Sequence, residues 1–235
     1  MTSQTTGIPD TGVPVVLLAH GSRHPDGVGS VDRLAAAVGP AARTAYLDLN
    51  QPDLTAAARA LAADGHRDAV VVPLLFTPAF HARTDAPSAV QRATEQTGVA
   101  LRVAPILGTG DDLFPILEQS LERAAIGDGP LLLCSVGSSR PAANATVAHL
   151  ADRLAARRGT AVHTAFATCD PRVGATLDRH PDIVGVLSLF VGHGLLLDRI
   201  GAAAAERGVP ATPPLEGALA GIVADRYRSG LEFDA

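Results

Sequence analysis

Short apolar runs alternate along the chain with longer stretches in which apolar residues recur every three or four positions. The runs predict strands, because they lack polar alternation and are bounded by turn residues. They cover residues 13–19, 44–49, 69–75, 99–104, 131–136, 161–167 and 183–189, with a short one near Pro210. Strands of this kind are typical of a parallel sheet that is covered on both faces.

The amphipathic stretches between these runs predict helices. They span residues 29–42, 54–64, 86–97, 112–125, 142–157, 172–180, 196–207 and 216–227. Because strands and helices alternate along the chain, we predict an α/β fold.

The two halves of the chain resemble each other. The sequence AHGSR at residues 19–23 follows the first predicted strand, and SVGSSR at 135–140 follows the fifth. Gly21 and Gly137 are 116 positions apart, and Asp85 and Asp198 are 113 apart. A repeat of this length predicts an internal duplication into two similar, parallel, four-stranded α/β units.

The predicted units are residues 13–127 and 128–235, since the turn-forming segment GDGP at 127–130 separates them. A polar, flexible tail is expected at residues 1–12, because it lacks the charged start and apolar core of a secretory signal. The repeat is degenerate: Val136 stands where the first half has His20, and no histidine of the second half aligns with His81.

Composition limits the classes of function. Hydrophobic residues make up 47% of the chain, yet no apolar run reaches the roughly 18 residues of a membrane helix. Cys134 and Cys169 are too few for an iron–sulfur cluster, which takes about four thiolates, and too far apart for a redox pair. We expect both to be buried free thiols in the reducing cytoplasm.

The net charge of −5 argues against a nucleic-acid partner, which usually requires a basic face. It leaves room for a small anionic ligand held by a few arginines. The chain has no G-x-S-x-G elbow, Walker loop or H-E-x-x-H motif, and no nucleotide is expected. Two fused units could form a cleft without a partner, so we expect a monomer, with a homodimer as the alternative.

Three polar residues fall at predicted strand ends in the first half. His20 ends the first strand, Asp48 lies near the end of the second, and His81 follows the third. Ligands of open parallel sheets bind outside the carboxyl ends of strands, and imidazoles with a carboxylate suit iron, cobalt, nickel or zinc. We predict a metal site here, although any one histidine alone would more simply be a hydrogen-bonded loop residue.

Anion-binding groups lie near the same strand ends. Gly21 and Ser22 begin the turn into a predicted helix, whose backbone N–H groups could hold an anion. The alternative is a tight turn in which Ser22 caps the helix. Arg23, Arg83 and Arg140 could meet carboxylates.

The remaining histidines are expected at the surface, with one exception. His193 follows a strand of the second half and could face a cleft, whereas the others fall in helices or polar loops: His24, His66, His149, His163 and His180.

Four segments of the first half resemble the motifs of a known family. LLAHGSR at residues 17–23 is similar to the opening motif of the CbiX/SirB-type sirohydrochlorin chelatases, and YLDLNQP at 46–52 to the F-L-E-x-x-E-P segment of that family. PLLF at 73–76 and HARTDAP at 81–87 are similar to the family segment that ends in H-x-x-x-D-I-P. In the second half the resemblance is looser and rests on residues 137–140 and 189–192.

The resemblance implies a class II chelatase fold and an ATP-independent lyase. Such an enzyme inserts a divalent metal into a tetrapyrrole of sirohaem or cobalamin synthesis. Of the two metals we expect Fe²⁺, with Co²⁺ as the alternative. His20 and His81 match the family's metal-binding histidines. Asp48 stands at the place of a family Glu that is one methylene longer, and Gln51 replaces a second Glu. Relatives have small or apolar residues around the position of His193.

The implied chemistry suits these residues. Metal insertion requires a loosely held, partly dehydrated metal and removal of two pyrrole protons, which an open imidazole site can provide. Two alternatives remain. The weakened acidic positions Asp48 and Gln51 would fit a metal or tetrapyrrole carrier without catalysis, and His193 would fit a chelatase-fold enzyme with another metal or ligand.

Overall fold

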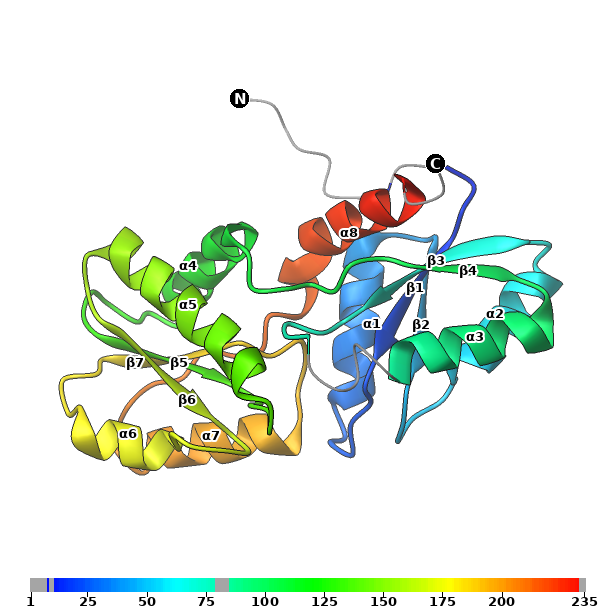
Figure 1. Cartoon of the computed structure of the whole chain (residues 1–235). Coiled ribbons are helices and arrows are strands. Elements are labelled where there is room, and N and C mark those ends of the chain that lie inside the picture. The colour runs from blue at the N-terminus through cyan, green and yellow to red at the C-terminus, as the bar shows by residue number, and fades with distance from the viewer. Residues whose placement is uncertain (1–7, 9–10, 79–84, 233–235) are drawn as a thin grey trace. The chain divides into compact units, whose positions relative to one another are not determined.

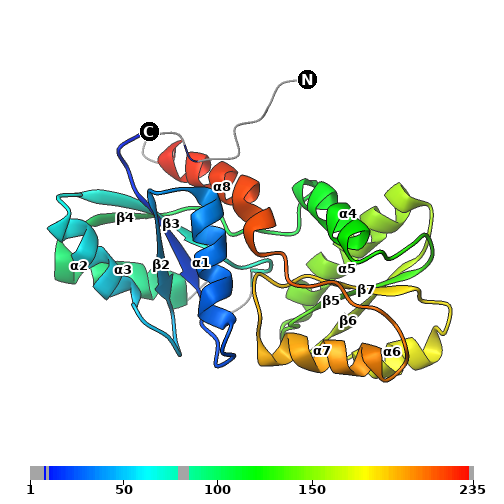
Figure 2. The ribbon, with the colours of Figure 1, turned by 180° about the vertical axis from the view of Figure 1, so that it is seen from behind.

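The structure, a computed structural model, describes residue 8, residues 11–78 and residues 85–232. Contacts between Cα atoms divide the chain into two compact units. The first comprises the chain up to Gly108 together with Glu216–Ala235, and the second comprises Thr109–Leu215. Each unit consists of a parallel sheet with helices on both faces (Figures 1 and 2).

The first unit has a four-stranded parallel sheet in the order β2-β1-β3-β4. Its strands are β1 (Val15–Ala19), β2 (Ala42–Tyr46), β3 (Asp68–Pro73) and β4 (Ala100–Val103). In the register of the sheet Ala19 lies opposite Tyr46, and Leu18 lies opposite Pro73. The carboxyl ends of β1, β2 and β3 therefore meet at one edge.

Among the described residues of this unit, four helices cover the sheet: α1 (Gly27–Val38), α2 (Leu54–Ala63), α3 (Ala86–Thr97) and α8 (Ala220–Glu232). α2 and α3 pack on one face, where alternate strand residues such as Val16, Leu18 and Val71 form a core cluster with them. α1 and α8 pack together, and α8 lies against β3 (Figure 1).

The second unit has a three-stranded parallel sheet in the order β6-β5-β7. Its strands are β5 (Leu131–Ser135), β6 (Val162–Phe166) and β7 (Gly185–Ser188). Its helices are α4 (Phe114–Arg123), α5 (Pro141–Arg158), α6 (Val173–Arg179) and α7 (Leu195–Ala205). Short 3₁₀ turns, η2 (Asp111–Leu113) and η3 (Glu216–Leu219), precede α4 and α8.

The predicted α/β duplication is confirmed, with one difference in strand number. The order β6-β5-β7 repeats the order β2-β1-β3, but the strand expected near Pro210 is reduced to a single bridge between Val186 and Ala211. Pro210, Pro213 and Pro214 surround this bridge, and proline has no N–H with which to continue a ladder. The second sheet therefore has three strands where four were predicted.

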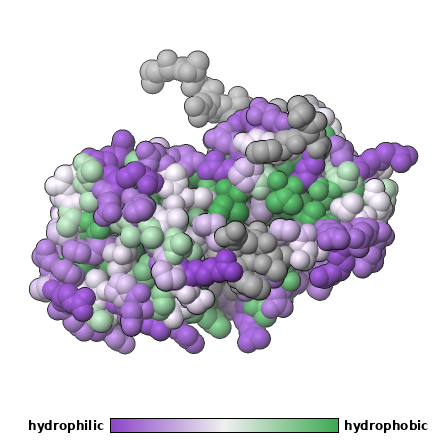
Figure 3. Space-filling model, viewed as in Figure 1, coloured by the Kyte–Doolittle hydropathy of each residue, from purple (hydrophilic) through white to green (hydrophobic). Residues whose placement is uncertain are grey.

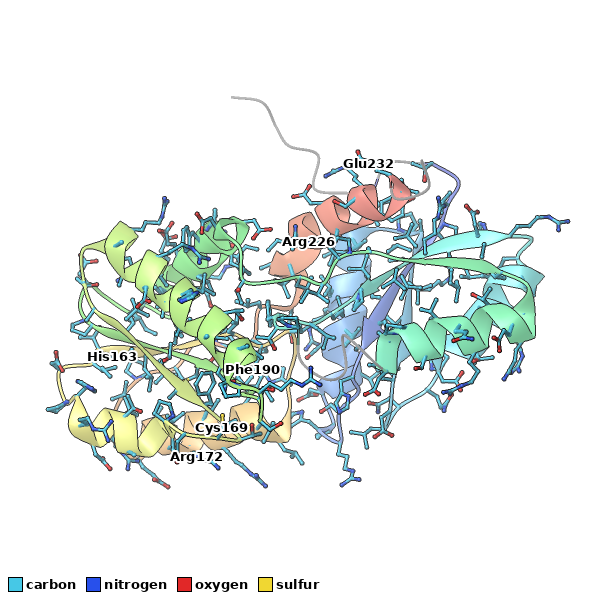
Figure 4. The ribbon with its side chains drawn as sticks, viewed as in Figure 1. His163, Cys169, Arg172, Phe190, Arg226 and Glu232 are labelled. Atoms are coloured by element: carbon cyan, nitrogen blue, oxygen red, sulfur yellow. The ribbon has the colours of Figure 1, made fainter. Side chains whose placement is uncertain are left out.

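The units also differ from the contiguous segments that the sequence suggests. Residues 109–127 belong to the second unit, and α8 returns to the first. The reason for this return is burial: Ile222, Val223 and Tyr227 of α8 are buried, and the Tyr227 hydroxyl donates to the carbonyl oxygen of Val13 (2.7 Å). The Arg226 guanidinium, labelled in Figure 4, also donates to the Ile106 carbonyl (2.9 Å).

The two cysteines are free thiols. Cys134 is buried, as expected, and burial raises the pKa of its thiol far above the usual range. Cys169 is half-exposed, so the expectation of burial is wrong for this residue: it lies in the loop after β6 instead of within a strand.

Among the described residues, no helix is long and apolar enough to cross a membrane. Hydrophilic residues cover much of the face shown in Figure 3, and hydrophobic ones lie among them in smaller patches.

Candidate functional site

The carboxyl edge of the first sheet brings His20 and Asp48 onto adjoining loops. His20 directly follows β1, and Asp48 lies two residues beyond β2. The N–H of Leu47 donates to the carbonyl oxygen of Ala19 (2.9 Å), and the N–H of Asp48 donates to that of His20 (3.0 Å). These two bonds extend the β1–β2 pairing beyond the strands. The side chains of both His20 and Asp48 are exposed at this edge.

Gly21 is required by the close approach of these loops. Its φ is +103°, and a Cβ atom at this position would lie 1.9 Å from the carbonyl oxygen of Asp48. Only glycine adopts this conformation and leaves this space empty without strain.

Ser22 lies in a tight turn and not at the start of a helix. Its N–H donates to Oδ1 of Asn50 (2.6 Å), and its hydroxyl oxygen accepts from the N–H of His24 (3.1 Å). α1 begins only at Gly27, with Asp26 at the N-cap. Gly21 and Ser22 thus lie in the turn that leads into α1, which begins two residues before the predicted residue 29, and the Ser22 N–H bonds to Asn50. Ser22 is not the helix cap.

The Asp48 loop is shaped by its own hydrogen bonds. The N–H of Asn50 donates to the carbonyl oxygen of Asp48 (2.8 Å) across Leu49, whose φ is +65°. One carboxylate oxygen of Asp48 accepts from the Leu49 N–H (2.7 Å). The side-chain oxygen of Gln51 accepts from the Asp53 N–H (3.0 Å). Asp48 thus carries the exposed carboxylate of this loop, and the Gln51 side chain stabilises the backbone of the loop.

Other predicted site residues are spread over both units. Arg23 is exposed in the same turn as Gly21, whereas Arg140 is exposed at the N-cap of α5 in the second unit. His81 and Arg83 lie outside the described residues. Within the part of the chain that is described, no group of three or more His, Cys, Asp or Glu side chains lies close enough to hold a metal ion.

Three histidines of the second unit have distinct surroundings. His193 is half-exposed in the loop between β7 and α7. His163 and His180 were expected as separate surface residues, but their rings stack with centroids 3.8 Å apart. His163 lies at the other end of its sheet from Cys169 and Phe190 (Figure 4).

The second unit repeats the turn without the histidine and the carboxylate of the first. The N–H of Thr168 donates to the carbonyl oxygen of Val136 (3.0 Å), as that of Asp48 does to His20. Gly137 has φ +85°, and the Ser138 N–H donates to Oδ1 of Asn144 (2.8 Å). Val136 and Thr168 therefore occupy the positions of His20 and Asp48, and the Thr168 hydroxyl also donates to the Val136 carbonyl (2.9 Å).

Asn50 is the functional candidate that sequence reasoning missed. Its signal in the sequence is weak, because a polar residue between Leu49 and Gln51 is ordinary in a loop. Its importance follows from the approach of two segments that are 28 residues apart.

Known structures define the class of this fold as a chelatase fold. SirB from Bacillus subtilis with Fe³⁺ matches with a TM-score of 0.75 and 19% identity, over 92% of this chain and 94% of that one. The sirohydrochlorin chelatase SirB from Bacillus subtilis subspecies spizizenii, in complex with cobalt, matches with a TM-score of 0.76 and 20% identity, over 94% and 96%. At this level of sequence identity, the similarity shows that the folds are alike and nothing further.

Sequence comparison relates the first half of the chain to one family. The CbiX family profile matches residues 14–124. The sirohydrochlorin cobaltochelatase of Sulfurisphaera tokodaii is 33% identical over 78 residues, which is 33% of this chain and 62% of that relative's length, less than two thirds of it. The first half of the chain is therefore similar to the CbiX family in sequence, and the whole chain is similar to the SirB structures in fold.

Proposed function

We propose that this protein is a sirohydrochlorin chelatase, which inserts a divalent metal into the macrocycle without a nucleotide. The observation that carries the proposal is the pairing of His20 and Asp48 at the carboxyl edge of the first sheet, where the Asp48 N–H donates to the His20 carbonyl. The similarity to a named sirohydrochlorin cobaltochelatase supports it.

The metal, as substrate, would be held by His20, Asp48 and His81. Imidazole and carboxylate together suit borderline divalent metals, and a site with few protein ligands leaves positions open for the incoming macrocycle. Because His20 and Asp48 are both exposed, the metal can arrive from solvent. The Asp48 carboxylate is already oriented by the Leu49 N–H (2.7 Å).

The same groups would accept the protons that insertion releases, because transfer of the metal to the macrocycle frees their lone pairs. One M²⁺ enters the macrocycle as two pyrrole N–H groups lose their protons, so the charge is balanced. Neutral histidine accepts protons near pH 7, and His20 and His81 are the candidates for this role.

Arginines would hold the carboxylates of the macrocycle. Arg23 lies in the turn beside His20, and Arg140 begins α5 in the second unit. Charge-assisted hydrogen bonds from guanidinium to carboxylate are the expected contacts, with Arg83 as a third candidate. Gly21 and Ser22 would contribute by shaping the turn.

We propose Fe²⁺ as the preferred metal and Co²⁺ as the alternative, in the cytoplasm and as a monomer. The two similar SirB structures hold Fe³⁺ and cobalt, and the curated relative is named for cobalt, so the same fold accommodates both elements. Side-by-side rates with the two metals under identical anaerobic conditions decide the preference.

The decisive experiment is an anaerobic insertion assay. Sirohydrochlorin and Fe²⁺ or Co²⁺ are mixed with the full-length protein, and the absorbance of the macrocycle is followed. Acceleration over the spontaneous reaction is expected with at least one metal, and its absence with both would reject the enzyme. His20→Ala and His81→Ala should each lower the rate at least 100-fold, whereas His149→Ala, an exposed residue of α5, should not change it.

A carrier is the second candidate. It is motivated by Gln51, which stands where the family has an acidic residue and whose side-chain oxygen accepts from the Asp53 N–H. A carrier would bind one equivalent of metal or tetrapyrrole tightly and show no turnover in the same assay.

A further inference from the structure

Asn50 connects the two loops that carry the proposed metal ligands. Its Oδ1 accepts from the Ser22 N–H at 2.6 Å, a short distance for an amide hydrogen bond. Its own N–H donates to the Asp48 carbonyl (2.8 Å), so its side chain is directed from the Asp48 loop to the turn after His20. A Cβ atom at Gly21 would lie 3.1 Å from the same Oδ1, which places the amide directly against the turn.

The duplicated unit supplies independent support for the importance of this bond. In the second turn, Oδ1 of Asn144 accepts from the Ser138 N–H at 2.8 Å. Asn50 lies in the loop after β2, but Asn144 lies in α5, so the two asparagines come from different elements. Both turns therefore have the same acceptor for the same N–H, although the residues are not equivalent in the repeat.

We propose that Asn50 is a positioning residue for His20. It acts through the Ser22 N–H, which it holds two residues beyond the histidine, and so fixes the backbone from which the imidazole projects. The proposal rests on the proposed function, because it assumes that His20 binds the metal. In the second unit the equivalent bond holds a turn that carries Val136, so it positions no ligand there.

A metal site depends on such outer contacts. Residues that orient metal ligands typically change metal affinity by about 10–100-fold when they are replaced. Asn50 acts on the backbone and not on the imidazole ring, so we expect an effect at the lower end, about tenfold. The hydrogen bond between Ser22 and Asn50 orders the loop before the metal binds and does not contact the macrocycle. Its loss should therefore raise KM for the metal and leave kcat almost unchanged.

The test compares Asn50→Ala with Asn144→Ala in the full-length protein. Each variant removes one turn bond, and faster hydrogen exchange at the amide of Ser22 or Ser138 reports its loss. Anaerobic calorimetric titration with Co²⁺ should give a Kd about tenfold higher for Asn50→Ala and unchanged within about twofold for Asn144→Ala. In the insertion assay, KM for Co²⁺ should rise by the same factor for Asn50→Ala, with kcat within about twofold of the wild type.

Asn50→Asp is the conservative variant. It keeps an acceptor oxygen at the same distance from the backbone and replaces the amide nitrogen by a second, negatively charged oxygen position, which also attracts a cation, so its Kd for Co²⁺ should not exceed the wild-type value. A tenfold higher Kd for Asn50→Asp would overturn the proposal, even if Asn50→Ala did not fold.

The outcomes separate this proposal from the proposed function. If His20→Ala abolishes Co²⁺ binding while Asn50→Ala leaves it unchanged, the bond is structural and the positioning role is rejected. If His20→Ala itself leaves Co²⁺ binding unchanged, His20 is not a metal ligand, and both the proposed metal site and the positioning role of Asn50 are rejected.

Discussion

The backbone N–H of Asp48 donates to the carbonyl oxygen of His20 across 3.0 Å, just beyond Ala19 and Tyr46, the last paired residues of β1 and β2. This bond joins the histidine and the carboxylate through the backbone, so their separation does not depend on flexible side chains alone. Because the two loops are already ordered, little further ordering would be required when a metal binds. This helps a site with few protein ligands to hold a metal.

Asp48→Asn should separate the charge of this residue from its role in the loop. Asparagine keeps an oxygen that can accept from the Leu49 N–H, so the fold should be retained. Loss of the negative charge should weaken Co²⁺ binding by about tenfold, as calorimetric titration would show. Asp48→Glu restores the charge with a longer reach, and should bind at least as tightly as Asp48→Asn. Equal affinity of Asp48→Asn and the wild type would exclude Asp48 as a ligand.

Gly21→Ala should damage the turn itself. The added Cβ would lie 1.9 Å from the Asp48 carbonyl oxygen, and the backbone φ of +103° is unfavourable for alanine. We expect a loss of about 2–4 kcal/mol in the free energy of unfolding, together with loss of Co²⁺ binding. Gly137→Ala is the matched control, since its Cβ would lie 2.7 Å from Cβ of Phe166 at φ +85°. It should also unfold more easily, yet the folded protein should bind Co²⁺ normally.

The elements of the fold were predictable because burial imposes a strict pattern on this chain. β5 and α3 fall where the apolar run and the amphipathic stretch indicate, within a residue or two. The fourth strand of the second sheet was a misreading of an apolar run, although the prolines at 210, 213 and 214 are visible in the sequence.

The candidate site was only partly predictable. Residue type and strand ends point to His20 and Asp48, because parallel strands place their carboxyl ends at one edge. The bond between Ser22 and Asn50 was not predictable, since it requires two segments 28 residues apart to approach within 2.6 Å. The return of α8 to the first unit was hidden for the same reason: periodicity shows which face of a helix is buried, but not on which sheet.

The C-terminal helix should be essential for the first unit to fold alone. Burial of a large apolar side chain contributes about 1.5–3 kcal/mol, and α8 buries Ile222, Val223 and Tyr227. The summed contribution of these three side chains is comparable with the whole free energy of unfolding of a domain, about 5–15 kcal/mol. A fragment of residues 1–127 should therefore lack a cooperative unfolding transition. Joining Gly108 to Glu216 by a flexible linker of about 10 residues should restore one, as urea denaturation followed by circular dichroism would show. A cooperative transition in the fragment 1–127 would contradict the assignment of α8.

The stacked pair His163 and His180 should make stability depend on pH. Burial, and then repulsion from His180, lower the pKa of His163 in the folded protein, while Asp182 opposes them. The folded state therefore resists a proton that the unfolded chain accepts below a pKa of about 6.5. This contribution to stability is complete above that pH and is lost as the pH falls through the folded-state pKa. The midpoint of urea denaturation should therefore decrease as the pH is lowered from 8 to 5.

His180→Gln isolates the contribution of the pair, because other groups titrate in the same pH range. The substitution removes the repulsion from His180 and leaves the burial of His163. The pKa of His163 should therefore rise toward its usual value. Nuclear magnetic resonance titration of the imidazole protons measures this shift directly. The decrease in urea midpoint between pH 8 and pH 5 should be smaller in His180→Gln than in the wild type. An identical His163 titration in both proteins would show that the stacked rings are not coupled electrostatically.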